Sequence, residues 1–133
     1  MNRAANITIW IVAIFYAYGA FVHIMNILGQ SGFDWLAAPR KWQALDVFYL
    51  VLDVVVAVGL FLNWKIAFFC FYVAATTQIV LYTVFRGWIL DVPEEFAVAP
   101  EQADYLWSLV AFHIVTLVLV TGALLILNRQ TGA

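Results

Sequence analysis

The sequence predicts an all-α membrane protein whose four transmembrane helices form an antiparallel up-down bundle. Hydrophobic residues make up 66% of the chain and charged residues only 11%, whereas average soluble domains hold about 45–50% apolar and about 25% charged residues. Four apolar stretches reach the length of about 20 residues that a helix needs to cross a bilayer. We therefore expect the 133 residues to form a single polytopic membrane domain. The net charge of −2 provides no basic stripe for a nucleic-acid partner.

The first apolar stretch begins near Ile7 and runs for about 20 residues without a charged side chain. A cleavable signal peptide has a shorter apolar core of about 7–15 residues, so we expect this stretch to be retained as a transmembrane helix. The four predicted spans are residues 7–28, 42–62, 65–86 and 105–127.

The connections between the spans differ in length and character. The link between the second and third spans, Asn63-Trp64 followed by Lys65, is very short, which predicts a tight helical hairpin. The connection at 29–38 carries Trp35, a residue typical of a membrane interface. The connection at 87–104 contains Asp91-Val92-Pro93-Glu94-Glu95, a pattern typical of a helix start. It predicts a short interfacial helix before the fourth span, with a second helix start at Pro100.

The orientation in the membrane follows only weakly from the charges. The six basic residues divide three and three between the two sides of the predicted bundle, so the positive-inside rule does not decide. We expect a bacterial inner-membrane protein with both termini in the cytoplasm. The side that carries the connections at 29–38 and 87–104 is called the outer side below.

Polar residues recur along the predicted helices at intervals of three or four, which places them on one helical face. The stripes include His23 on the first helix, Asp53 on the second and His113 on the fourth. Because lipid cannot satisfy polar groups, we expect the stripes to face one another inside the bundle. The other residues predicted to bind a ligand there are Tyr16, Asn26, Asp46, Tyr49, Gln78, Tyr82 and Arg86.

The polar stripes are concentrated toward the outer side. With a rise of 1.5 Å per residue, His23 lies about 8 Å and His113 about 12 Å from the outer ends of their helices. The inner halves hold apolar runs such as VVVAVGLFL and VTLVLVTGALLIL. A channel needs a polar lining across the whole membrane, so the pattern predicts a pocket open to one side instead.

Three residues are the candidates for catalysis: His23, Asp53 and His113. Ionisable side chains at membrane depth are costly and usually functional, and histidine and aspartate can act as general acid and base. The same three side chains would be a suitable ligand set for Zn or Fe, so a metal site is part of the hypothesis.

The sequence leaves several functions open. The first hypothesis is a pocket for a small lipid-like molecule or a metal ion. A second is haem b held by His23 and His113, with Gly19 making room and Arg40 or Arg86 near the propionates. Neighbouring helices at about 8–10 Å leave little space for that macrocycle. A third is an accessory or structural subunit that docks on a membrane-protein partner or forms a homo-oligomer.

Overall fold

The computed structural model describes residues 2–132, and every regular element within them is helical. Four helices are long and apolar enough to cross a membrane, as composition predicted. They are α1 (Arg3–Ile27), α2 (Arg40–Phe61), α3 (Lys65–Thr83) and α5 (Pro100–Thr131). The chain is therefore an all-helical integral membrane protein.

The helix ends follow local capping rules. The side chain of Asn2 accepts a hydrogen bond from the backbone N–H of Ala5 at 3.0 Å and so caps α1. Helix α5 begins at Pro100, with Glu101 in its first turn, as the sequence predicted. Because it starts there and continues to Thr131, α5 is longer than the apolar span of 105–127.

The short elements lie elsewhere than predicted. Helix α3 ends at Thr83, and a separate short helix, α4 (Arg86–Leu90), follows it. Asp91 closes α4 instead of starting a helix, and only a single 3₁₀ turn, η2 (Glu94–Phe96), forms after it. Pro93 accounts for the difference, because a proline disfavours helical backbone at the residue before it. The connection between α1 and α2 contains another 3₁₀ turn, η1 (Trp35–Ala37).

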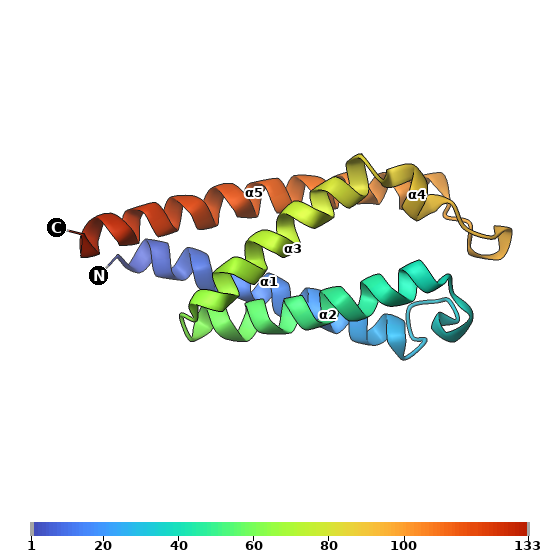
Figure 1. Cartoon of the computed structure of the whole chain (residues 1–133), viewed down its shortest axis with the longest axis horizontal. Coiled ribbons are helices and arrows are strands. Elements are labelled where there is room, and N and C mark those ends of the chain that lie inside the picture. The colour runs from blue at the N-terminus through green and yellow to red at the C-terminus, as the bar shows by residue number, and fades with distance from the viewer. Residues whose placement is uncertain (1, 133) are drawn as a thin grey trace.

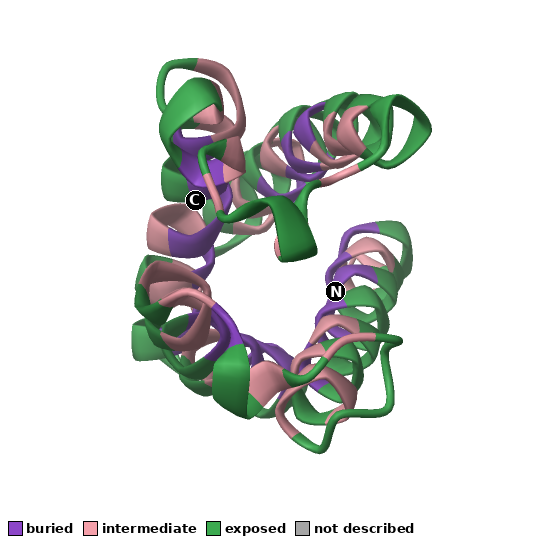
Figure 2. Ribbon diagram, turned by 90° about the vertical axis from the view of Figure 1, so that its right-hand side faces the viewer, coloured by how far each residue is buried: buried purple, intermediate pink, exposed green. Residues whose placement is uncertain are grey.

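The four long helices form a ring in which each packs against two others. Helix α1 contacts α2 and α5, and α3 contacts the same two helices. Figure 1 shows both chain termini at one end of the molecule and η1, α4 and η2 at the other. Figure 2, seen along the long axis, shows exposed positions mainly on the outward faces of the helices.

The half of the bundle near the termini is closed by an apolar core. Small residues allow close packing there, and a Cβ added at Gly59 would overlap the Cβ of Ala67 across the α2–α3 hairpin. The core comprises Ala5, Ile9, Val12, Ala13, Tyr16, Val56, Ala57, Leu60, Ala67, Phe71, Ala74, Ala75, Val120 and Ala123. The polar side chains are consequently gathered in the other half.

Candidate functional site

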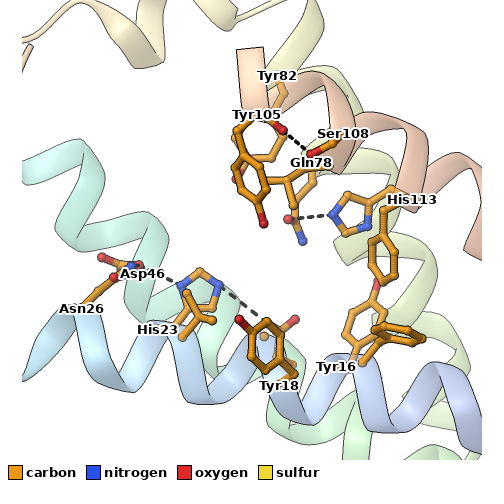
Figure 3. A pocket seen from close by; sticks show the side chains of 16 residues that line it. Tyr16, Tyr18, His23, Asn26, Asp46, Gln78, Tyr82, Tyr105, Ser108 and His113 are labelled. Carbon is orange, nitrogen blue, oxygen red and sulfur yellow. Dashed lines mark hydrogen bonds and ion pairs between the residues drawn. The ribbon is translucent and has the colours of Figure 1, made fainter. Parts of the chain in front are cut away.

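A cavity of about 500 Å³ lies in the half of the bundle remote from the termini. All four long helices contribute to its wall, so the polar stripes do face the interior (Figure 3). Its lining is Phe15, Tyr16, Tyr18, Gly19, Val22, His23, Asn26, Asp46, Asp53, Gln78, Tyr82, Tyr105, Ser108, Leu109, Phe112 and His113. Eight of the ten predicted site residues are in this set.

His23 lies between two aspartates of α2. Its Nδ1 is 2.7 Å from Oδ1 of Asp46, and its Nε2 is 3.6 Å from Oδ2 of Asp53. Asp46 also accepts hydrogen bonds from Nδ2 of Asn26 and Nε1 of Trp35, both at 2.9 Å. A carboxylate held by three donors is a rigid anchor for the imidazole of His23 (Figure 3), and it leaves Nε2 facing Asp53.

Asp53 reaches this position because α1 carries a glycine opposite it. A Cβ on Gly19 would lie 2.6 Å from Oδ2 of Asp53, closer than any ordinary contact. Asp53 is only 4% exposed, and its Oδ1 has no hydrogen-bond partner. Burying a carboxylate oxygen without a partner is costly, so Asp53 is the most demanding polar group of the cavity wall.

A second polar pair forms the opposite wall of the cavity. Nε2 of His113 lies 2.9 Å from Oε1 of Gln78, and this geometry fits an N–H donated by the imidazole. In that neutral tautomer Nδ1 is an acceptor, and it is buried without a partner. The hydroxyl of Tyr16 is likewise buried and unpartnered. Tyr16, Asp53 and His113 all line the cavity, and each has one buried polar atom without a hydrogen-bond partner.

The cavity opens sideways between α1 and α5. Its lining includes residues with highly exposed side chains on both helices, such as Tyr18 at 64% and Tyr105 at 60%. Phe15, Val22 and Ser108 are exposed members of the same rim. For helices that cross a bilayer, this opening faces hydrocarbon.

A smaller cavity of about 230 Å³ adjoins the first. His23, Asn26, Asp46 and Tyr82 line both cavities, so the His23–Asp46 pair lies between them. The rest of the smaller cavity is formed at the outer end of the bundle by Phe33, Trp42, Leu45, Tyr49, Leu81, Ile89, Leu90, Val98, Gln102 and Leu106.

Two predicted site residues do not line the main cavity. Arg86 donates to the carbonyl of Ala103, and its guanidinium lies 4.7 Å from the ring centroid of Trp107. The break between α3 and α4 separates Arg86 from the face that carries Gln78 and Tyr82, which explains the difference. The hydroxyl of Tyr49 forms a hydrogen bond with Thr77 at 2.9 Å, and its ring stacks on the ring of His23. Tyr49 therefore helps to position His23 without lining the main cavity.

The predicted metal ligands do not converge. Within residues 2–132 no group of three His, Cys, Asp or Glu side chains is placed to hold a metal ion. His113 pairs with Gln78 instead of joining His23 and Asp53. Bis-histidine ligation of haem also finds no support, because Nε2 of His23 faces Asp53 and Nε2 of His113 faces Gln78.

Sequence reasoning missed Trp35 as part of the site. We expected it only as an interfacial anchor, but its indole N–H secures Asp46. The available signal was Asp34, whose side chain accepts from the backbone N–H of Leu36 at 3.1 Å and thereby shapes the turn. Such a turn indicates an ordered connection, although it does not indicate where the indole points.

Comparisons of the chain with protein-family models, curated proteins and solved structures found no match. The chemistry of the site is therefore inferred from its own residues and their geometry.

Proposed function

We propose that this membrane protein binds a small lipid-like molecule that has one polar end. The polar end would lie among Tyr16, Asp53 and His113, and the apolar body would leave between α1 and α5. The observation that carries the proposal is a laterally open cavity in which the polar residues Tyr16, Asp53 and His113 stand among aromatic side chains. Polar side chains buried in this way are usually hydrogen-bonded, and a ligand with a polar end would add partners for them.

The dimensions and lining of the cavity agree with this proposal. Its volume of about 500 Å³ falls within the range of about 300–1,000 Å³ typical of small-molecule sites. Such sites are mainly apolar with a few placed polar groups, and here aromatic side chains such as Phe15 and Phe112 surround the polar cluster. The alternative, an accessory subunit that docks on a partner through its polar stripes, is less favoured because these stripes line the cavity.

The site also supports proton transfer to or from the bound molecule. Asp46 orients His23 as carboxylates orient catalytic histidines, and Nε2 of His23 is directed at the cavity wall beside Asp53. In this proposal His23 or Asp53 gives a proton to the polar end of the bound molecule or takes one from it. His113 binds the same polar end from the opposite wall.

We propose that the four long helices cross a bacterial inner membrane in alternating directions. Both termini would be cytoplasmic, and α4 with η2 would lie at the outer interface. Single cysteines at Ser31 and Gln130, in a Cys70→Ser background, test this orientation because Ser31 is exposed in the connection between α1 and α2 and Gln130 is exposed near the C-terminal end of α5. A membrane-impermeant thiol reagent applied to intact cells should label Ser31→Cys alone, and labelling of Gln130→Cys alone would reverse the orientation.

A cavity-filling variant tests the binding function. Leu109 lines the cavity, so Leu109→Trp should occupy its space. Val118 lies on the same helix with 67% exposure and outside the cavity, so Val118→Trp is the matched control. Each protein is purified in mild detergent, and the molecules that accompany it are extracted and identified by mass spectrometry.

The expected result is a stoichiometric small molecule with wild type and Val118→Trp and its loss with Leu109→Trp. Equal amounts in all three folded proteins would place the molecule outside the cavity and contradict the proposal. Absence of any molecule from wild type, together with no binding of added amphiphiles, would also contradict it.

A further inference from the structure

The charges around the cavity are unbalanced toward the negative. The described residues that line it include two carboxylates, Asp46 and Asp53, and no lysine or arginine. A protonated His23 would balance only one of these carboxylates. Arg86, which the sequence placed in this site, is engaged with Ala103 and Trp107. A ligand that carries a negative charge would therefore meet repulsion without a cation to offset it.

The two carboxylates differ in what they still require. Asp46 already accepts from three donors, on His23, Asn26 and Trp35. Asp53 has only Nε2 of His23, at 3.6 Å from its Oδ2, while its buried Oδ1 has no partner. A carboxylate accepts hydrogen bonds and cannot donate them when ionised. The carboxylate of Asp53, when ionised, can therefore accept a further hydrogen bond, and a charged donor satisfies it best.

The walls around Asp53 also suit a cation. Aromatic rings attract ammonium groups to their faces, and the attraction grows when water is excluded. Rings are supplied by three of the four long helices. These aromatic lining residues are Phe15, Tyr16, Tyr18, Tyr82, Tyr105 and Phe112.

We propose that the polar end of the ligand is a protonated amine that forms an ion pair with the carboxylate of Asp53, which lines the cavity. This inference rests on the proposed function, because it assigns the headgroup of the molecule that the cavity binds. The ammonium charge balances Asp53 while His23 stays paired with Asp46. The alkyl chain of the bound amine extends outward through the opening between α1 and α5.

Three probes of equal chain length test the headgroup: decylamine, decan-1-ol and decanoate. Each is titrated into the protein in phosphatidylcholine nanodiscs, and binding is followed by tryptophan fluorescence after subtraction of empty nanodiscs. Equal chains keep the apolar contribution comparable, so the ratios of Kd report the headgroup. A hydrogen bond to a charged partner predicts that decylamine binds about 10- to 100-fold more tightly than decan-1-ol. Decanoate should bind most weakly.

The variant Asp53→Asn should abolish the preference for decylamine. Its matched control is Glu101→Gln, which removes one negative charge at the same end of the bundle from an exposed residue outside the cavity. Glu101→Gln should retain the wild-type ratio of Kd values. Thermal unfolding of both variants in nanodiscs shows that they are folded, and retention of decan-1-ol binding by Asp53→Asn provides an independent check.

Failure of the headgroup proposal and failure of the binding function give different results. In one such result, decan-1-ol or decanoate binds more tightly than decylamine and loses this binding in Leu109→Trp. That result would overturn the assignment of an amine headgroup but would still support the ligand-binding cavity. A preference for decylamine that persists in Asp53→Asn would overturn the role of Asp53. No protein-dependent binding of any probe would overturn both.

Discussion

Replacing Gly19 by alanine should push Asp53 out of its position beside His23. The added Cβ would lie 2.6 Å from Oδ2 of Asp53, whereas an ordinary contact begins at 3.4 Å, so the carboxylate must retreat by 3.4 − 2.6 = 0.8 Å. Overpacking of this kind typically costs about 1–3 kcal/mol. Helix propensity offsets part of the cost, because alanine is favoured over glycine by about 1 kcal/mol within a helix.

Gly122→Ala is the matched control that isolates the steric term. Gly122 also lies within a long helix, but a Cβ there meets nothing within 4 Å. Because the propensity gain enters both variants, the difference in free energy of unfolding between Gly19→Ala and Gly122→Ala should be about 1–3 kcal/mol. Unfolding in mixed micelles of dodecyl maltoside and increasing sodium dodecyl sulfate, followed by circular dichroism, measures this difference.

The assignment of the cost to Asp53 is tested by a double-mutant cycle. In an Asp53→Ala background the clashing oxygen is absent, so Gly19→Ala should no longer be destabilising relative to Gly122→Ala. The reasoning is refuted if Gly19→Ala is as well tolerated as Gly122→Ala in the wild-type background. It is equally refuted if the full cost remains after Asp53 has been shortened.

The remaining predictions concern the groups that hold the two histidines. Trp35→Phe removes a donor to Asp46 and should lower the free energy of unfolding by about 1 kcal/mol in the same assay. The control is Trp64→Phe at the exposed α2–α3 hairpin. An equal loss of stability in the two variants would contradict the prediction. Gln78→Leu leaves Nε2 of His113 without its acceptor and should cost about 1–3 kcal/mol. Most of that loss should be recovered in the double variant with His113→Phe, and an additive result would argue against the pairing. Removing divalent metals with EDTA should leave the unfolding free energy unchanged, because His23 and Asp46 bind each other rather than joining a three-ligand metal set; a reproducible loss of stability on chelation would revive the metal hypothesis.

The sequence alone was sufficient to predict four helices long and apolar enough to span a membrane, and eight of the ten predicted site residues line the cavity. Both properties depend on local features, namely the length of an apolar stretch and the three- to four-residue spacing of polar side chains. His23, Asp53 and His113 were identified because ionisable groups are costly at membrane depth. The concentration of polar residues in one half likewise follows from counting along each helix.

Which polar group pairs with which was decided only by the tertiary structure. The pairing depends on the rotation and separation of neighbouring helices, and these are set by contacts between residues far apart in sequence. Gly19 lets Asp53 approach α1, Trp35 anchors Asp46 from a connection, and the break after α3 places Arg86 against α5. None of these arrangements has a local periodic signal, because each is a contact between separate elements. The same packing buries Asp53 and leaves its Oδ1 without a hydrogen-bond partner.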